Sequence, residues 1–168
     1  MSHRDWTMAA FNEFFKKVKF PQGAKVIDIG CRDQALKGVF KVYGIGWEGV
    51  DKEGGDSILK GHMENMNMIS DNIYDLVFSC HSFEHCEKPI SALKEFKRIL
   101  KPNGYLFMST PFPCEHQILR ADKDHIMCLN LMQIERLLDY VGFKLVKIYV
   151  QFNDDREQNN NIITIGRK

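Results

Sequence analysis

Hydrophobic and polar positions divide the chain into two kinds of segment. Short runs of β-branched and apolar residues predict buried strands, and longer segments with an apolar residue every three or four positions predict amphipathic helices. The expected strands cover residues 25–29, 47–50, 57–60, 74–80, 105–109, 143–150 and 162–165. The expected helices cover residues 5–19, 33–42, 89–100 and 131–141.

Glycine, proline and asparagine mark where these segments end. Pro21 follows the first expected helix, Pro89 suits the first turn of the third, and Gly142 is a helix stop. The Lys-Pro-Asn-Gly sequence at 101–104 predicts a turn, and the asparagines at 159–161 predict a hairpin turn.

Strands that alternate with helices predict an α/β fold with a mostly parallel sheet. The last two strands are joined by a connection too short for a crossover helix, so we expect them to pair antiparallel. The chain, residues 1–168, is therefore expected to form one domain. Its sheet should be Rossmann-like, with seven strands or slightly fewer and an antiparallel C-terminal hairpin. A dinucleotide-binding sheet differs, because its last strand returns through a helix.

Composition narrows the possible partners. The 168 residues are 44% hydrophobic and 27% charged, which is typical of a soluble globular domain. Lys plus Arg number 23 against 22 for Asp plus Glu, so no electrostatic footprint for nucleic acid or an anionic membrane is expected. No apolar run reaches membrane-spanning length and no signal peptide is evident. The five cysteines form no CxxC motif, which favours reduced thiols in the cytoplasm over a cysteine-based zinc site.

Acidic residues and a glycine follow the first two strands. Gly30 lets the backbone turn sharply and approach a ligand, and Asp28 either holds a ligand ammonium or caps the turn. Asp51 follows the second strand roughly 20 residues later, where a carboxylate can accept both ribose hydroxyls of a nucleoside. The alternative for Asp51 is a solvated loop acid. Ligands of open α/β sheets bind beyond the carboxyl ends of the strands, so these residues predict a nucleoside site.

The segment that begins at Tyr74, YDLVFSCHSFEHCEKPISALKEFKRILKPNGYLFMSTPFP, closely resembles the fourth-strand to fifth-strand region of class I S-adenosylmethionine-dependent methyltransferases. That family has an aromatic-Asp-Leu-Val strand, a Glu-His pair, an Arg-x-Leu-Lys-Pro-Gly-Gly turn and a Ser-Thr-Pro strand end. Here the turn runs from Arg98 to Gly104, with Asn103 where glycine is usual. The likeness covers most of the chain from Ala24 onward. Further matches are His116, His125, Gly142 and Phe143.

The resemblance implies S-adenosyl-L-methionine as the cofactor, bound along the carboxyl ends of the strands. Its methionine part is expected against the first strand, its ribose after the second strand and its adenine after the third. A carbonyl at the end of the fourth strand is expected to accept a hydrogen bond from the cofactor's amino group. The implied residues are Asp28, Gly30 and Cys31 for methionine, Asp51 for ribose, His62 and Met63 for adenine, and Ser79 for the amino group, with His81 close by. Lys52, next to Asp51, is a further expected cofactor residue.

The chain also departs from the family pattern. The Gly-x-Gly-x-Gly turn keeps only Gly30, with Arg32 and Gln34 at the other glycine positions. His62 replaces an acid that usually contacts adenine, and residues 51–57 are too few for the customary helix. These departures leave a degenerate cofactor site open. They also resemble a compact subgroup that lacks the helix.

The string His81-x-x-Glu84-His85 matches a zinc-protease motif. That motif needs a long helix, whereas this string follows a buried strand, so the protease interpretation is set aside. A divalent-metal site formed by His81, Glu84 and His85 stays open, because some related methyltransferases use acid and histidine groups there. The other interpretation is a hydrogen-bonded packing pair.

Three histidines are candidate catalytic groups: His85, His116 and His125. The last two lie in the segment 111–128, which leaves the fifth strand on the ligand-binding side. A general base there can deprotonate a hydroxyl or amine acceptor. The alternative is that these histidines hold a long loop in place.

The residues and the resemblance together predict methyl transfer from S-adenosylmethionine to a small-molecule, sugar or lipid-linked acceptor. The acceptor pocket is expected between the N-terminal helix and the 111–128 segment, while the aromatic residues at 11–15 are expected in core or lid packing. A non-catalytic cofactor-binding or partner-binding module is the main alternative. A nicotinamide-dependent oxidoreductase is a poorer match, because the chain lacks Gly-x-Gly-x-x-Gly.

Overall fold

The computed structural model describes residues 3–113, 124–152 and 160–168, and it has the expected α/β architecture. Seven strands form one sheet in the order β3-β2-β1-β4-β5-β7-β6. The strands are β1 (Lys25–Ile29), β2 (Gly46–Asp51), β3 (Ile58–Lys60), β4 (Tyr74–Cys80), β5 (Leu100–Pro111), β6 (Lys144–Gln151) and β7 (Asn161–Arg167). The helices are α1 (His3–Phe15), α2 (Lys37–Val42), α3 (Pro89–Ile99) and α5 (Leu131–Val141), with a 3-10 turn, η1 (Phe83–His85).

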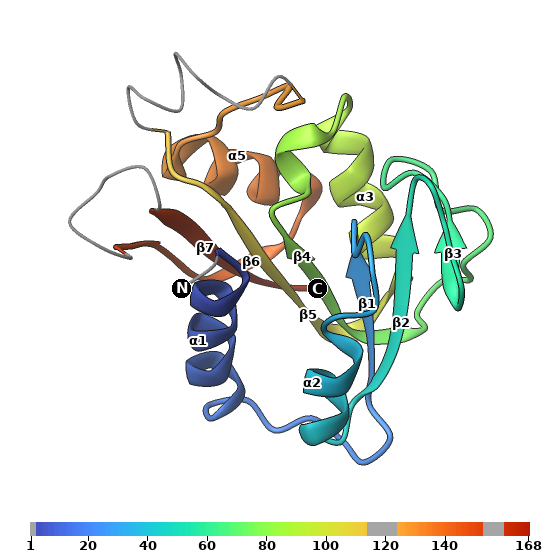
Figure 1. Ribbon diagram of the computed structural model, residues 1–168. Helices are drawn as coiled ribbons and strands as arrows, with labels where there is room; N and C mark the ends of the chain where they lie inside the picture. The colour runs from blue at the N-terminus through green and yellow to red at the C-terminus, as the bar shows by residue number, and fades with distance from the viewer. Residues whose placement is uncertain (1–2, 114–123, 153–159) are drawn as a thin grey trace.

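Strand direction is as expected. The pairs from β3 to β5 are all parallel, so the carboxyl ends of β1, β2 and β4 point to one edge of the sheet together with that of β5 (Figure 1). The strand β7 lies between β5 and β6 and is antiparallel to both, which confirms the C-terminal hairpin.

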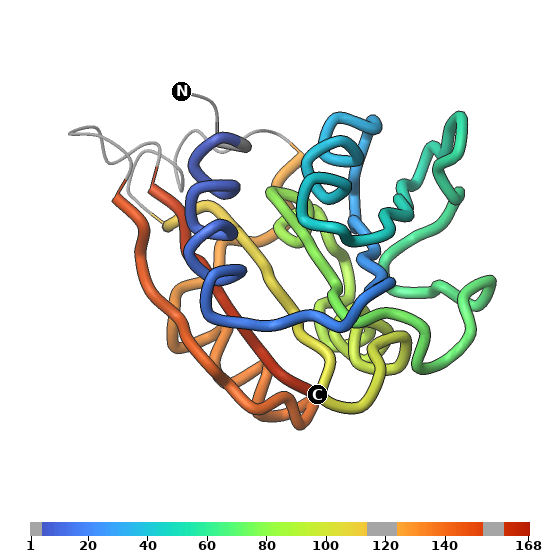
Figure 2. Tube along the Cα trace, turned by 90° about the horizontal axis from the view of Figure 1, so that it is seen from below, coloured from blue at the N-terminus to red at the C-terminus, as the bar shows by residue number. Residues whose placement is uncertain are grey.

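Helices cover both faces of the sheet (Figures 1 and 2). On one face, α1 and α2 bury an aromatic cluster; on the other, α3 and α5 pack over a larger aliphatic core. Phe11 is fully buried, and its ring lies 5.3–5.5 Å, edge-on, from the rings of Phe40, Phe78 and Phe107. Aromatic pairs favour such edge-to-face contacts. Phe11, Phe14 and Phe15 therefore lie in the core or pack against it, one of the two placements expected for the aromatic residues at 11–15.

Several boundaries differ from the sequence-based ones for local reasons. The predicted helix at 33–42 begins only at Lys37, because the Asp33 carboxylate accepts a hydrogen bond from the Ala35 amide (2.9 Å) and holds a turn. The predicted turn at 101–104 lies within β5 as an irregularity, and Asn103 has a φ of 66° there. The first helix ends at Phe15 rather than at residue 19.

The helix α5 has both predicted ends. The Asn130 side chain accepts from the Gln133 amide and the Gln133 side chain accepts from the Asn130 amide, which is a capping box. Gly142 follows with a φ of 81° in the left-handed region, where glycine is favoured. None of the helices in the described ranges has both the length and the apolarity that crossing a membrane requires.

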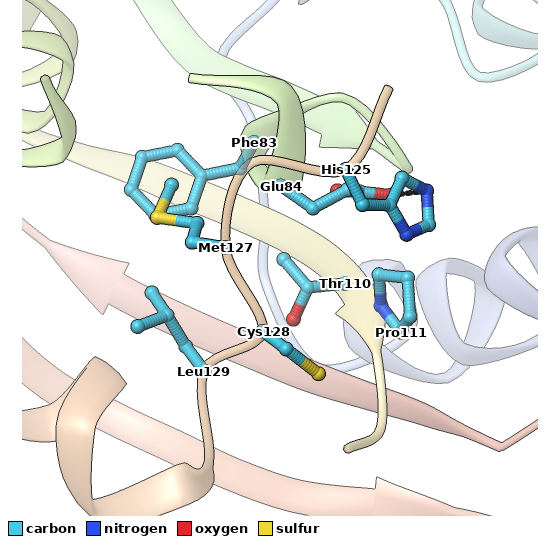
Figure 3. A pocket seen from close by; sticks show the side chains of 8 residues that line it. All are labelled: Phe83, Glu84, Thr110, Pro111, His125, Met127, Cys128 and Leu129. Carbon is cyan, nitrogen blue, oxygen red and sulfur yellow. Dashed lines mark ion pairs between the residues drawn. The ribbon is translucent and has the colours of Figure 1, made fainter. Parts of the chain in front are cut away.

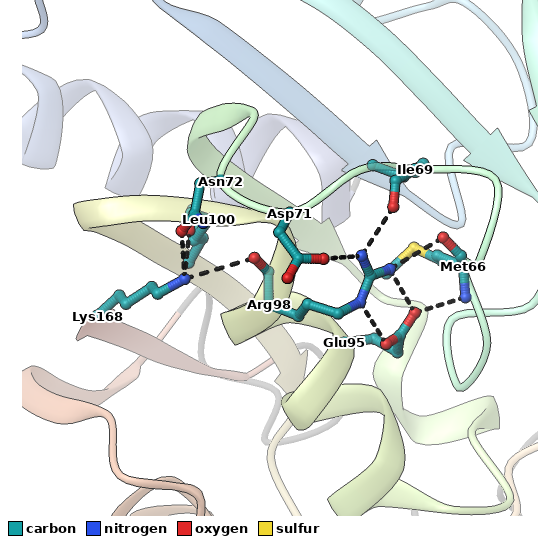
Figure 4. A network of polar contacts seen from close by, with 8 residues as sticks. All are labelled: Met66, Ile69, Asp71, Asn72, Glu95, Arg98, Leu100 and Lys168. Carbon is teal, nitrogen blue, oxygen red and sulfur yellow. Dashed lines mark hydrogen bonds and ion pairs between the residues drawn. The ribbon is translucent and has the colours of Figure 1, made fainter.

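Arg98 of α3 anchors the loop between β3 and β4 (Figure 4). Its guanidinium donates to the Glu95 and Asp71 carboxylates and to the carbonyls of Met66 and Ile69, at 2.6–3.0 Å. Its hydrogen bond to Glu95 lowers the pKa of that carboxyl. This loop contains the residues predicted to lie beside adenine, His62 and Met63, so α3 helps to fix that end of the sheet edge.

Candidate functional site

The turn after β1 requires a glycine. Gly30 has a φ of 68°, and its amide donates to the Val50 carbonyl at 2.8 Å. A Cβ atom at Gly30 would lie 2.4 Å from the Cβ of Ser82. The Ser82 hydroxyl donates to the Ile29 carbonyl (2.7 Å) and lies 2.8 Å from the Ser79 hydroxyl. The segment after β4 thus packs directly against the glycine turn, and the sharp turn predicted at Gly30 is confirmed.

Asp51, at the end of β2, is held by backbone amides on both carboxylate oxygens. Oδ2 accepts from the Arg32 amide at 2.8 Å, and Oδ1 accepts from the Glu53 amide at 3.2 Å. A carboxylate oxygen can accept two hydrogen bonds, so each one retains acceptor capacity. Arg32 has a φ of 55°, so the backbone keeps a left-handed conformation where the family has glycine.

Asp28 is 3% exposed in β1, and its Oδ2 accepts from the Trp47 indole N–H at 3.3 Å. Gly49 lies opposite Asp28 in β2, and a Cβ there would lie 2.7 Å from both the Trp47 ring and Cys31 Sγ. Trp47 was not foreseen as a site residue. A glycine inside a strand was the available signal, because it marks a close approach. Burial raises the pKa of the Cys31 thiol to about 12 and keeps it neutral.

The other predicted cofactor residues follow the ends of β2, β3 and β4. Lys52 and His62 are exposed, and Met63 is half-buried against the larger core. Ser79 lies one residue before the end of β4, in register with β1 and β5. His81 comes next, with a φ of 50° and its amide donating to the Ser109 carbonyl at 2.9 Å.

A second group of side chains surrounds Glu84 in η1. Its carboxylate is buried, and both oxygens accept no hydrogen bond from any residue the structure describes. Its Oε1 lies 3.5 Å from His81 Nδ1 and 3.9 Å from His125 Nε2, and Figure 3 shows the contact with His125. The Glu84 carbonyl accepts from the amides of Ile126 and Met127 at 3.0 and 3.2 Å. The segment that follows residue 123 therefore folds onto η1.

This folding joins two of the predicted catalytic histidines. The rings of His85 and His125 lie edge-on with centroids 4.8 Å apart, and His85 Nδ1 lies 2.8 Å from the Asp124 carbonyl. His116 lies outside the described residues. Within the described ranges, Glu84, His85 and His125 bring their ligand atoms close enough together to hold a metal ion. The set predicted from the sequence was His81, Glu84 and His85, so His125 takes the place of His81 in the observed group.

A small pocket opens between η1, the end of β5 and the segment before α5 (Figure 3). Four of its lining residues are apolar, and its polar members include Glu84, His125 and Thr110. The Thr110 hydroxyl is buried without a hydrogen-bond partner among the described residues. Thr110 and Cys128 were not foreseen, because no motif marks them. The lining residues are Phe83, Glu84, Thr110, Pro111, His125, Met127, Cys128 and Leu129.

Comparisons with known proteins agree with this architecture. Residues 3–148 match the family model described as "Methyltransferase domain". The ubiquinone biosynthesis O-methyltransferase of Actinobacillus pleuropneumoniae is 27% identical over 107 residues, which cover 52% of this chain and 46% of that protein. The chain thus spans about half the length of the curated relatives it matches.

Solved structures share the fold at low sequence identity. A SAM-dependent methyltransferase from Archaeoglobus fulgidus has a TM-score of 0.74 at 20% identity, with 99% of this chain and 95% of that chain covered. The 1,6-didemethyltoxoflavin-N1-methyltransferase of Burkholderia thailandensis, solved with 1,6-didemethyltoxoflavin and S-adenosylhomocysteine, has a TM-score of 0.74 at 13% identity. That alignment covers 99% of this chain and 77% of the other.

Proposed function

The chain belongs to the methyltransferase-domain family, and from this premise we propose that it transfers a methyl group from S-adenosyl-L-methionine to a small-molecule acceptor. Acceptors that carry a sugar or a lipid-linked group fall within the proposal. The matched curated relative is named for O-methylation in ubiquinone biosynthesis, and one structural neighbour for N-methylation of a didemethyltoxoflavin. Both names are those of small-molecule methyltransferases, which supports this acceptor class.

The main structural support for cofactor binding is the contact between the turn after β1 and the end of β2. The Gly30 amide binds the Val50 carbonyl, and the Arg32 amide binds the Asp51 carboxylate, so the glycine turn and the acid form one rim. An open α/β sheet binds its ligand beyond this edge. Asp51 retains acceptor capacity for two ribose hydroxyls, and Asp28 is the nearby buried acid expected at the methionine end.

The cofactor supplies an already activated sulfonium methyl, so the protein's main task is to align the acceptor for in-line displacement. His125 lines the pocket beside the ends of β4 and β5, and His85 contacts its ring. A neutral imidazole at this place can take the proton of a hydroxyl or amine acceptor, an effect that typically gives about 10²–10⁴-fold in rate.

Binding of S-adenosylhomocysteine to the purified chain tests the cofactor part. Asp51→Ala should weaken binding at least about tenfold, because hydrogen bonds to a charged group contribute roughly 1.5–3 kcal/mol. Glu53→Ala is the matched control: it removes an exposed acid from the same loop but keeps the amide that binds Asp51. Equal affinities of wild type and Asp51→Ala by calorimetry would show that the carboxylate does not bind the ribose.

A non-catalytic module is the second candidate, because Arg32 and Gln34 occupy two glycine positions of the family turn. The same calorimetry tests the form of this candidate that has lost the cofactor. Absence of binding to both S-adenosylmethionine and S-adenosylhomocysteine would support a partner-binding module over an enzyme.

A further inference from the structure

We propose that Glu84, His85 and His125 form a binding site for a zinc-class divalent metal ion at the carboxyl ends of β4 and β5. One ligand atom from each residue lies within 4.8 Å of the other two. The ligands come from η1 and from a segment 40 residues further along the chain, so the fold itself brings them together. The inference does not depend on methyl transfer, because it rests on these three side chains alone.

Glu84 supplies the strongest reason. Its side chain is 4% exposed, and both carboxylate oxygens are buried without a hydrogen bond from the described residues. Burying an unpaired carboxylate is costly, so buried charges in proteins are paired or coordinate metals. The imidazole nitrogens that face it, on His81 and His125, lie 3.5 and 3.9 Å from Oε1, beyond good hydrogen-bond length. A cation bound to the carboxylate would satisfy two oxygens that have no donor among the described residues.

His85 is oriented as a metal ligand would be. Its Nδ1 lies 2.8 Å from the Asp124 carbonyl, which only accepts, so Nδ1 carries the proton. In the neutral ring, Nε2 then has a free lone pair. Metal-bound histidines usually donate their other ring N–H to a carbonyl or carboxylate in this way.

His125 is held by the backbone around it. The two residues after it donate their amides to the Glu84 carbonyl, so the main chain that carries the imidazole is held beside the main chain that carries the carboxylate. Zinc ligands lie about 2.0–2.2 Å from the metal, which puts neighbouring ligand atoms about 3.4 Å apart. The present separations, which reach at most 4.8 Å, therefore need to close by up to about 1.4 Å, which side-chain rotation can supply.

The ligand chemistry selects the metal. Two imidazoles and one carboxylate suit zinc and similar transition metals, whereas magnesium and calcium prefer oxygen ligands. A site with three protein ligands keeps a coordination position for water or substrate. Glu84 and His125 line the pocket, together with the Thr110 hydroxyl, which has no hydrogen-bond partner among the described residues, so this position would adjoin the pocket.

The experiment titrates the whole, chelator-treated chain with zinc chloride by calorimetry and follows its melting temperature. Wild type should bind one zinc ion per chain and melt at a higher temperature with zinc. Glu84→Gln and His125→Asn should each weaken zinc binding at least tenfold and lose the zinc-dependent shift. His62→Asn, which removes an exposed histidine elsewhere, and Cys128→Ser, which removes a pocket thiol, should both bind as wild type does.

Three results would overturn the site. They are an absence of zinc binding to wild type, zinc binding by Glu84→Gln equal to that of wild type, and loss of binding in Cys128→Ser. Circular dichroism of each metal-free variant checks folding, and Glu84→Gln should keep the wild-type spectrum because it keeps the side-chain shape. Titration with S-adenosylhomocysteine separates this inference from the proposed function, because cofactor binding should persist in Glu84→Gln.

Discussion

Two acidic side chains at the same edge of the sheet have opposite surroundings. Asp51, after β2, receives a backbone amide on each oxygen and is half-buried. Glu84, after β4, is more deeply buried and receives no hydrogen bond on either oxygen from the described residues. The acid after β2 is thus satisfied by the main chain, whereas the acid after β4 receives no hydrogen bond from the residues that the structure describes.

The two regions are also physically continuous. Ser82 faces the glycine turn and bonds the Ile29 carbonyl, while Glu84, two residues later, faces the pocket. One short segment after β4 therefore supports the cofactor turn with one residue and presents the buried acid with another. Substitutions in the two regions therefore test how far the stability of each region depends on contacts within the protein.

The largest effect is expected at Gly30. Gly30→Ala combines a φ of 68° with a Cβ that would lie 2.4 Å from the Ser82 Cβ, so Ser82 and its bonds must shift. We expect a loss of about 2–4 kcal/mol in the free energy of unfolding by urea denaturation, from backbone strain and overpacking. Gly38→Ala is the matched control: nothing lies within 4 Å of its Cβ position in α2, so a gain of about 0.5–1 kcal/mol is expected. Equal stabilities of the two variants would contradict the close packing at the turn.

A smaller effect of opposite sign is expected at Glu84. In a metal chelator at neutral pH, Glu84→Met should stabilise the chain by about 1–2 kcal/mol, because it replaces a buried carboxyl group that has no donor among the described residues by an apolar side chain of similar shape. Asp51→Asn should instead destabilise it by about 1 kcal/mol, since the amides of Arg32 and Glu53 lose a charged acceptor. Urea denaturation of both variants checks the contrast. A marked loss of stability in Glu84→Met would mean that the carboxylate already has a strong partner.

The sequence predicted the strands well because burial and local chemistry agree there. The strands at 25–29 and 74–80 and the helix at 131–141 have the predicted bounds. The helix is closed by an asparagine capping box and a left-handed glycine. Prediction was poorer where a short polar side chain competes with the helix, as at Asp33, or where a turn is absorbed into a strand, as at Asn103.

In the candidate site too, some residues could be predicted from the sequence and others could not. Asp28, Gly30 and Asp51 were recognisable because they directly follow or end parallel strands, and the sheet fixes where such residues lie. The contact of His85 with His125 depends on how the segment after residue 123 folds onto η1. So does the burial of the Glu84 carboxylate without a hydrogen bond from the described residues. Trp47 reaches Asp28 only because Gly49 leaves it room. Such contacts are set by tertiary packing, which no spacing in the sequence encodes.

The smallest effect is expected at Arg32, and it tests whether the altered glycine motif weakens the cofactor side. Arg32 already has the left-handed φ of a glycine, and its amide already binds Asp51. Arg32→Gly should relieve about 1 kcal/mol of backbone strain. It also makes the unfolded chain more flexible, at a cost of about 0.4–1 kcal/mol, so the net change in the free energy of unfolding should stay within about 0.5 kcal/mol. Because the amide position is unchanged, affinity for S-adenosylhomocysteine by calorimetry should stay within about threefold of wild type.

Asn103→Gly is the control, since it changes a second left-handed position, inside β5, and should leave cofactor binding unchanged. A tenfold rise in affinity for Arg32→Gly alone would show that the arginine side chain obstructs the cofactor. The hydrogen bonds that hold Asp51 would then not be sufficient for full cofactor affinity.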